Sequence, residues 1–305
     1  MVRSLAPIDL VIAGPTASGK SQLAMRWARE IGGEIVSADS RQIYREISVG
    51  TGKPSLSDQE AVPHHTIDLC SIRDVYSAGA FVRDARRAIE KIQARGNKVI
   101  VCGGTGLYIK ALLEGIVDLP ESDSTSSETF RESMEEFSTP TLYLRLMELD
   151  PERARLLSPR DRVRILRGLF LHELTGLPPT ELYRRSRGQS LSFRSFIVLS
   201  PDRETLYASI ERRVALMLDE GWVAEVEDLL SQGCNPEWPG FASLGYREVV
   251  AHLDGRLALG ELREAIVRKT RQYAKRQVTW FRHMAGAIPV DPAKAPHSLG
   301  VSFKI

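Results

Sequence analysis

The feature that most constrains this chain is a phosphate-binding loop motif near its start. Residues 14–21 read GPTASGKS, which fits the pattern G-x-x-x-x-G-K-[ST] without a mismatch. The apolar run IDLVIAG (8–14) leads into it, and an amphipathic stretch to about residue 30 follows. Because this motif requires a strand before it and a helix after it, the context predicts an α/β protein with a site for a di- or triphosphate.

The residues of this loop have distinct expected roles. Main-chain N–H groups and the following helix N-terminus form an anion cradle, Lys20 adds a positive charge, and the Ser21 hydroxyl can hold Mg²⁺. The expected phosphate-binding set is Gly14, Pro15, Thr16, Ala17, Ser18, Gly19, Lys20 and Ser21. A nucleotide hydrolase would add an apolar strand ending in Asp, but the strand VIVC (99–102) runs into GGTG, and no [NT]KxD is present. These observations argue against a motor protein or a GTPase.

Further apolar runs predict a parallel sheet. Strands are expected at EIVS (34–37), TIDL (66–69), KVIVC (98–102) and SFIVLS (195–200), and a helix over 78–95. After the last of these strands the pattern is helical only, over 203–219, 223–231, 246–253 and about 260–284. Alternating strands and helices are typical of a parallel sheet with helices on both faces. The predicted fold class is therefore α/β, with a P-loop NTPase-like core.

The composition changes between the last two predicted strands. Six acids and many Ser and Thr residues over 121–140 indicate a solvated or mobile segment and not a core element. Over 151–188, nine Arg and four acids leave a local excess of +5 on a helical pattern. We expect a core at 1–119 and 192–290, a small inserted helical domain at 120–191, and a tail at 291–305.

The overall composition excludes several classes of protein. The chain has 305 residues, 43% of them hydrophobic, and 41 Lys plus Arg against 39 Asp plus Glu. A nucleic acid would therefore have to be bound by a local basic patch. Three scattered cysteines (Cys70, Cys102 and Cys234) offer no disulfide framework, which indicates a reducing compartment. No apolar run approaches the roughly 18 residues of a membrane span, so we expect a soluble cytosolic enzyme.

Two polar residues are expected at the same edge of the sheet as the phosphate-binding loop. Asp39 follows the second predicted strand in SADSRQIY (37–44), and Thr105 follows the strand at 98–102 in GGTGLY (103–108). Asp39 could ligate a metal ion, accept a proton or only cap a helix. The Thr105 hydroxyl and N–H could bind a second phosphate oxygen, or the residue could belong to an ordinary tight turn.

Other polar residues permit both a functional and a structural interpretation. His64 and His65 are adjacent in a predicted extended segment, so they point to opposite faces and cannot share one metal ion. Either Arg212 or Arg213 could reach a diphosphate, although arginines on helices are commonly solvated. The basic insertion and the basic helix over 260–284 would suit a phosphate backbone, or would equally be solvated faces.

Several motifs together resemble one known family. In order along about residues 8–283, the chain contains GPTASGKS, SADSRQIYR, GTGKP, VPHHTID, GGTGLY, HELTGLPPTE, LGYRE and TRQYAKRQVTWFR. This order is similar to that of bacterial tRNA dimethylallyltransferases, also called tRNA isopentenylpyrophosphate transferases. The resemblance implies transfer of a dimethylallyl group from dimethylallyl diphosphate to the exocyclic amine of the adenosine 3′ of the anticodon (tRNA position 37). The tRNAs concerned are those that read codons beginning with U.

The resemblance also implies roles for particular residues. Asp39 matches the family's general base, Thr105 and Arg213 assist the leaving diphosphate, and Mg²⁺ is the expected cofactor. The implied tRNA contacts are Asp39, Ser40, Arg41, Gln42, Val163, Arg164, Ile165, Leu166 and Arg167. The expected partners are dimethylallyl diphosphate and the anticodon stem-loop of tRNA, with no membrane, and the expected state is a monomer in the cytoplasm.

Three positions depart from the family pattern. Arg41 stands where an apolar residue is expected, so local base contacts can differ. Gly52 replaces the alanine of GTAKP, which we expect to be a minor change. The acidic stretch 121–140 is shorter and more polar than the insertion usual in the family, so the contacts that hold the tRNA can differ in detail.

Three competing functions remain open at this stage. An adenylate dimethylallyltransferase would use the same phosphate-binding loop and Asp39 but would have less use for a basic insertion. A small-molecule or nucleoside kinase would consume ATP without releasing diphosphate from dimethylallyl diphosphate. A non-catalytic RNA-binding module would leave the phosphate-binding loop without a function.

Overall fold

The computed structural model describes residues 5–117, 124–186 and 190–292. The chain forms two compact units, one from 1–113 together with 191–305, and the other from 114–190. The boundary expected between residues 119 and 120, and the expected tail from residue 293 onward, lie outside the described residues.

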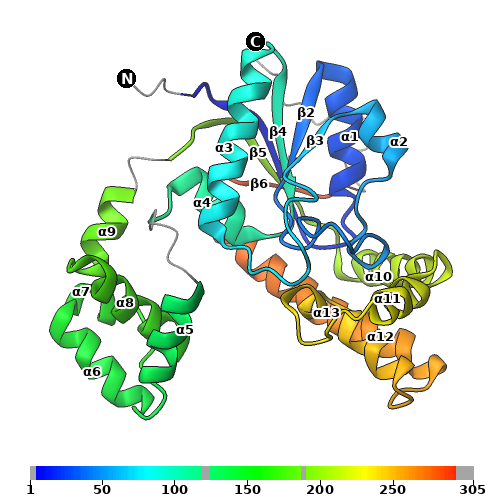
Figure 1. Ribbon diagram of the computed structural model, residues 1–305. Coiled ribbons are helices and arrows are strands. Elements are labelled where there is room, and N and C mark those ends of the chain that lie inside the picture. Colours follow the sequence, from blue (N-terminus) through cyan, green and yellow to red (C-terminus); the bar gives the residue numbers. More distant parts are fainter. Residues whose placement is uncertain (1–4, 118–123, 187–189, 293–305) are drawn as a thin grey trace. The chain divides into compact units, whose positions relative to one another are not determined.

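The first unit is built on a six-stranded, all-parallel sheet (Figure 1). Its strands are β1 (Ile8–Ala13), β2 (Gly33–Ser37), β3 (His64–His65), β4 (Lys98–Gly103), β5 (Phe193–Leu199) and β6 (Ile288–Val290). They lie in the order β3-β2-β4-β1-β5-β6. Val11 of β1 pairs with Val101 on one side and Phe196 on the other. The strand that leads into the phosphate-binding loop is therefore in the interior of the sheet.

Helices cover both faces of this sheet. The first helices are α1 (Lys20–Ile31), α2 (Leu56–Ala61), α3 (Ala78–Ala94) and α4 (Gly106–Glu114). Figure 1 shows α1 and α3 on opposite faces. Leu10 and Ile12 share a buried cluster with Ala24 and Ala28 of α1, while the alternate residue Val11 is equally buried. Burial of both faces confirms the predicted α/β class.

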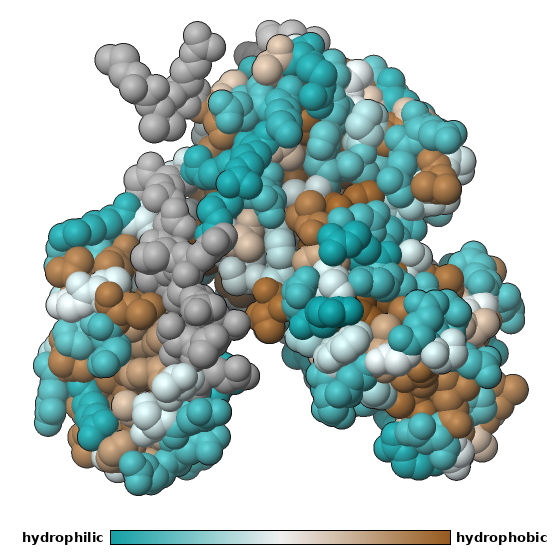
Figure 2. Space-filling model, in the orientation of Figure 1, coloured by the Kyte–Doolittle hydropathy of each residue, from teal (hydrophilic) through white to brown (hydrophobic). Residues whose placement is uncertain are grey.

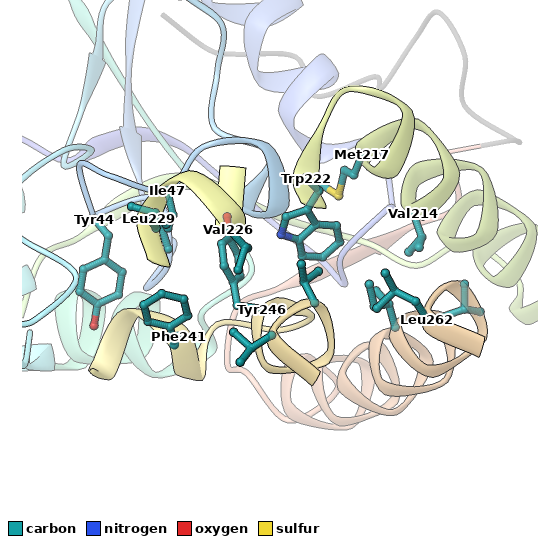
Figure 3. Close-up of a cluster of buried hydrophobic side chains, with 14 of the residues drawn as sticks. Tyr44, Ile47, Val214, Met217, Trp222, Val226, Leu229, Phe241, Tyr246 and Leu262 are labelled. Atoms are coloured by element: carbon teal, nitrogen blue, oxygen red, sulfur yellow. The ribbon is translucent and has the colours of Figure 1, made fainter. Parts of the chain in front are cut away.

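The C-terminal helices form a second core within the same unit. They are α10 (Arg203–Asp219), α11 (Trp222–Ser231), α12 (Tyr246–Leu253) and α13 (Leu259–Phe281), with the 3₁₀ turns η1 (Val49–Thr51) and η3 (Pro239–Ala242). Figure 3 shows Trp222 beside Tyr246 in this core, with ring centroids 5.5 Å apart. Glu225 of α11 accepts hydrogen bonds from the N–H groups of Ser48 and Val49 (2.7 and 2.9 Å). The chain segment after β2 is thereby anchored to these helices.

The strand expected at 66–69 is wrong. The structure has a two-residue strand at His64–His65, and Thr66 and Asp68 have left-handed backbone angles (φ 62° and 54°). The Thr66 hydroxyl donates to the carbonyl oxygen of Ser37 (2.8 Å). Extended backbone cannot continue through two left-handed residues, so the apolar Ile67 was a misleading signal.

The expectation of helices alone after β5 is also wrong. Ile288 and Val290 of β6 pair in parallel with Ile197 and Leu199 of β5. β6 is an edge strand, where Pro289 is tolerated because one side of the strand needs no ladder hydrogen bond. Three residues containing a proline are too short a signal to indicate a strand from the sequence.

The second unit is helical. It contains α5 (Ser124–Ser133), α6 (Thr139–Leu149), α7 (Pro151–Arg155), α8 (Arg162–Thr175) and α9 (Pro179–Ser186). Leu142, Leu146 and Leu169 lie in its core. The side chains of Phe130, Met134 and Phe137 also pack on this core. The interpretation of 121–140 as a solvated or mobile segment and not a core element is therefore wrong for Phe130 of α5 and for Met134 and Phe137 just after this helix.

The buried side chain of Asp150 ties the small helices of this unit together. Its carboxylate accepts hydrogen bonds from the N–H of Arg153 at the start of α7, and from the N–H and hydroxyl of Thr180 in α9 (2.9, 2.6 and 2.8 Å).

Outside this core, Figure 2 shows hydrophilic and hydrophobic side chains intermixed on the visible face of the unit. Among the described residues, no helix is both long and apolar enough to cross a membrane.

Candidate active site

The phosphate-binding loop connects β1 to α1. Ala17 and Gly19 have left-handed backbone angles (φ 61° and 86°), which curl the loop ahead of the helix. The Lys20 ammonium donates to the carbonyl oxygen of Pro15 (3.2 Å) and so folds back over the loop. The Ser18 hydroxyl is buried, and no partner for it is found among the described residues. An unpaired buried hydroxyl beside the N–H groups of a helix N-terminus fits a bound anion.

A cavity of about 620 Å³ opens beside this loop. Its lining includes Lys20, Ser21, Asp39, Gln42 and Gly52. Desolvation lowers the pKa of Lys20, while the nearby Cys102 and Asp39 act in the opposite direction. The cavity therefore places a lysine charge, a hydroxyl and a carboxylate around one space.

Asp39 lies two residues beyond the end of β2. The N–H of Ala38 donates to the carbonyl oxygen of Cys102 (2.8 Å), which continues the pairing of β2 with β4 up to the site. Asp39 Oδ1 accepts from the N–H of Arg41 (2.9 Å), a local turn that orients the carboxylate. The helix-capping alternative for Asp39 has no support here, because the next regular element is the 3₁₀ turn at Val49–Thr51.

Thr105 lies in the glycine-rich turn between β4 and α4. Its N–H donates to the carbonyl oxygen of Ala38 (3.1 Å). Its hydroxyl accepts from the N–H of Ser40 (3.0 Å) and donates to the Ser40 hydroxyl (3.3 Å). The expectation that both its N–H and its hydroxyl bind phosphate is therefore wrong for the N–H. Only the hydroxyl can rotate toward a ligand.

Arg213 of α10 is the arginine that faces the site. Desolvation lowers the pKa of Arg213, while the charges of Asp39 and Glu220 act in the opposite direction. A Cβ added to Gly52 would overlap the Arg213 guanidinium, so the two are in direct contact. Arg212 is exposed and donates to the Ser209 hydroxyl (3.2 Å). The choice of Arg213 over Arg212 is thus consistent with the geometry.

The two adjacent histidines have separate structural partners. His65 Nε2 lies 2.6 Å from Glu34 Oε2, and His64 Nδ1 lies 2.8 Å from the carbonyl oxygen of Val62. Desolvation lowers the pKa of His64. In the described parts of the chain, no group of three or more His, Cys, Asp or Glu side chains is arranged to hold a metal ion.

The segment 39–42 lies at the cavity, but Gln42 is already engaged. Its Nε2 donates to the carbonyl oxygen of Gly52 (3.0 Å), and its Oε1 accepts from the Ser37 hydroxyl (2.8 Å). A base contact through this amide would require both bonds to break. Asp39, Ser40 and Arg41 are partly exposed, and of these three only Asp39 is among the residues that line the cavity.

In the insertion, only part of the segment 163–167 is available to a partner. Val163 is 79% exposed, and Arg164 and Arg167 are exposed too. Ile165 is completely buried in the core of this unit, and Leu166 packs against the same core. The expected RNA contact by the Ile165 side chain is therefore wrong, because every third or fourth residue of α8 faces inward.

Many arginines of the insertion have partners inside it. Arg164 pairs with Asp161 (3.1 Å) and Arg184 with Glu152 (2.6 Å), and Arg185 pairs with Glu181. Arg153 stacks on the Tyr183 ring, and Arg162 donates to two backbone carbonyls. Arg187 lies outside the described residues. Fewer of these arginines are therefore available to bind RNA phosphates than the local charge excess of +5 suggests.

Sequence reasoning missed Gln277. This buried residue of α13 hydrogen-bonds to both glycine-rich loops of the site. It lies in the segment TRQYAKRQVTWFR, which carries the family resemblance, but no local pattern marks it out.

A parallel α/β core with a P-loop motif between β1 and α1, and a carboxylate that lines the adjoining cavity, define a protein with a P-loop-like fold. Comparison with known proteins identifies the kind of P-loop protein. The chain belongs to the IPP transferase family, whose model matches residues 42–284. The predicted family resemblance is confirmed.

Relatives and solved structures agree with this assignment. The chain is 43% identical over 286 residues to tRNA dimethylallyltransferase 1 of Syntrophotalea carbinolica, covering 93% of this chain and 91% of that one. A tRNA isopentenylpyrophosphate transferase structure from Staphylococcus epidermidis matches with a TM-score of 0.68 and 32% identity, covering 97% and 96%. A eukaryotic dimethylallyltransferase acting on tRNA matches with a TM-score of 0.80 and 30% identity, covering 94% of this chain and 74% of that one.

Proposed function

We propose that this protein transfers the dimethylallyl group of dimethylallyl diphosphate to the exocyclic amine of the adenosine 3′ of the anticodon, in tRNAs that read codons beginning with U. Diphosphate is the second product. Besides family membership, one observation carries the proposal: Asp39 lines the same cavity as Lys20 and Ser21 of the phosphate-binding loop. A proton acceptor beside a diphosphate site suits a displacement at the carbon that bears the diphosphate.

The proposed chemistry assigns a task to each charged group. The amine nitrogen forms a bond to the allylic carbon while the bond from that carbon to the diphosphate oxygen breaks. Negative charge then grows on the diphosphate, where Lys20, Arg213 and the N–H groups at the start of α1 stabilise it. Asp39 accepts the proton that the nitrogen loses.

Mg²⁺ is the metal ion that we propose for this site. The Ser21 hydroxyl and the Asp39 carboxylate both line the cavity. Mg²⁺ in phosphate sites is commonly held by one or two protein oxygens, with water and phosphate oxygens completing its shell. The Ser21 hydroxyl beside a diphosphate therefore fits this ion, which would neutralise charge on the leaving group, while the Asp39 carboxylate accepts the proton.

The tRNA would be positioned by contacts outside the cavity. An exocyclic amine in a stacked anticodon loop is hard to reach, so the base would be extruded into the site. Exposed Arg164 and Arg167 of the insertion would contact phosphates and set the register of the RNA. Action on tRNA also favours a cytoplasmic location.

The test is label transfer from radiolabelled dimethylallyl diphosphate in the presence of Mg²⁺. An unmodified anticodon stem-loop RNA is offered in parallel with AMP, ADP and ATP. The RNA carries adenosine at the target position and at the positions on both sides of it. We expect label in the RNA alone. We also expect Asp39→Ala to lower turnover by about a hundredfold or more while RNA binding is kept.

The other outcomes separate the competing functions. Label in a free nucleotide would make the protein an adenylate dimethylallyltransferase. ATP consumption without label transfer would indicate a kinase, and RNA binding without turnover would indicate a binding module. Asp254→Asn, at an exposed carboxylate paired with Arg256, is the matched control and should keep full activity. Full turnover by Asp39→Ala would refute the general-base role.

A further inference from the structure

The side chain of Gln277 lies between the two glycine-rich loops of the site. It projects from α13, and Figure 1 shows this helix passing beneath the lower end of the sheet. Gln277 Oε1 accepts from the N–H of Thr16 in the phosphate-binding loop (2.8 Å). Its Nε2 donates to the carbonyl oxygen of Gly104, the residue before Thr105 (2.8 Å). One amide therefore joins the loop that follows β1 to the turn that follows β4.

The two partners need opposite hydrogen-bonding groups. A backbone N–H requires an acceptor and a backbone carbonyl requires a donor, and a planar amide offers one of each. Gln277 is only 6% exposed, so water cannot readily replace either bond. An ionised carboxylate in its place could accept from Thr16 but could not donate to Gly104.

The same face of α13 touches the glycine-rich turn a second time. Trp280 lies three residues after Gln277, and a Cβ added to Gly106 would overlap its indole ring. A Cβ added to Gly104 would lie 2.5 Å from Gln277 Nε2 and 3.5 Å from Lys20 Nζ. Thr105 thus sits between two glycines that allow α13 to approach closely, and the Lys20 ammonium lies beside the same turn.

We infer that Gln277 is a positioning residue for the transfer reaction, which sets the spacing between the phosphate-binding loop and the turn that carries Thr105. This inference rests on the proposed function. Gln277 does not touch substrate. It acts by holding Lys20 and Thr105 at a constant separation across the diphosphate, so its loss should weaken binding of the diphosphate substrate.

The test uses Gln277→Glu and Gln277→Met, with Gln272→Glu at an exposed position of the same helix as the control. At pH 8 we expect both Gln277 variants to lose roughly tenfold or more in kcat/KM, mainly through a higher KM for dimethylallyl diphosphate with little change in the KM for tRNA. As the pH falls, the ratio of Gln277→Glu to wild-type activity should rise, because a protonated carboxyl group can donate to the Gly104 carbonyl. The Gln277→Met ratio should stay constant.

The charged and titratable neighbours of residue 277 determine the pH at which the Gln277→Glu variant regains activity. Burial raises the pKa of a carboxyl group, whereas the Lys20 ammonium beside the turn lowers it. Burial also raises the pKa of Tyr273, one turn earlier on α13, to about 12, so that residue stays neutral throughout. Activity is expressed as a ratio to wild type because Asp39 itself loses basicity at low pH.

Two results would overturn the inference. One is that the Gln277→Glu variant has the same pH profile of activity and the same KM for dimethylallyl diphosphate as the wild-type protein. The other is a lowered melting temperature with unchanged kcat/KM in the folded variants, which would indicate a role in stability alone. Binding of inorganic diphosphate, measured by calorimetry, tests the same spacing without turnover. If the wild-type protein transferred no label, the proposed function would be refuted. The calorimetric measurement of diphosphate binding would still test the role of Gln277.

Discussion

At the scale of single residues, Gly52 is in direct contact with the guanidinium of Arg213. Gly52 has a left-handed backbone (φ 59°), and a Cβ at this position would overlap the guanidinium of Arg213. Glycine here was expected to be a minor departure, and the contact with Arg213 gives that expectation a direct test. Without a Cβ, the loop lets the arginine charge rest against its backbone, beside the cavity that Gly52 also lines.

Replacing Gly52 by alanine should displace Arg213. We expect Gly52→Ala to raise the KM for dimethylallyl diphosphate several-fold, and to cost about 1 kcal/mol of stability from the left-handed backbone. The control is Gly96→Ala, where φ is 78° but a Cβ would meet nothing within 4 Å. Steady-state kinetics and thermal unfolding of both variants give the comparison. An equal effect of the two substitutions on KM would contradict the role of the Arg213 contact.

At the scale of elements, a buried carboxylate attaches the short edge strand β3 to the sheet. Glu34 of β2 is bonded to His65 of β3 (2.6 Å), to Arg95 after α3 (2.7 Å) and to Asn97 before β4 (2.7 Å). Burial by itself would raise the pKa of Glu34, but the hydrogen bonds from Arg95, Asn97 and His65 outweigh it and hold the pKa at about 2. Two residues of strand pairing are thus reinforced by a charged side chain.

This carboxylate should make stability depend on pH. The pKa of Glu34 is about 2 in the folded protein against 4.5 for an unperturbed glutamate. Its contribution is therefore present above about pH 4.5 and is lost as the pH falls toward 2, by about 2 kcal/mol between pH 7 and pH 3. Urea unfolding across this range should show that loss in wild type and in the exposed control Glu60→Gln. Glu34→Gln should lack it, and an unchanged pH dependence in Glu34→Gln would contradict this account.

At the scale of the whole molecule, the chain folds into two compact units. The α/β unit holds the cavity and both glycine-rich loops. The helical insertion has its own core and carries exposed arginines on α8. In the function proposed above, the α/β unit performs the chemistry on the diphosphate substrate and the insertion supplies positioning contacts to RNA phosphates.

Removing the exposed arginines of α8 should weaken tRNA binding. We expect Arg164→Ala with Arg167→Ala to lower tRNA affinity and to reduce the slope of log affinity against log salt by about one unit for each RNA phosphate that is no longer neutralised. The turnover of bound tRNA should change little. Arg184→Ala with Arg185→Ala removes the same net charge from α9 and serves as the control. Equal decreases in affinity in both double variants would indicate a general charge effect and not a contact by α8.

Much of the fold and part of the site could be predicted from local patterns. The phosphate-binding loop is recognisable because its strand, its glycines and its helix are consecutive in the sequence. Asp39 and Thr105 follow for a similar reason, since the carboxyl ends of neighbouring parallel strands meet at one edge. The strand β6 and the turn at Thr66 were beyond prediction, because pairing with β5 and a hydrogen bond to Ser37 decide them.

The class of fold and the family could be read from the order of strands, helices and motifs along the chain. The groups that hold the glycine-rich loops in place became visible in the folded structure. Gln277 is 261 residues from Thr16 and 173 from Gly104, and Gly52 meets Arg213 from a different element. Such contacts have no local periodicity, because they depend on how distant elements pack. A motif can therefore specify which groups bind the ligand, whereas the spacing between those groups is set by the folded chain.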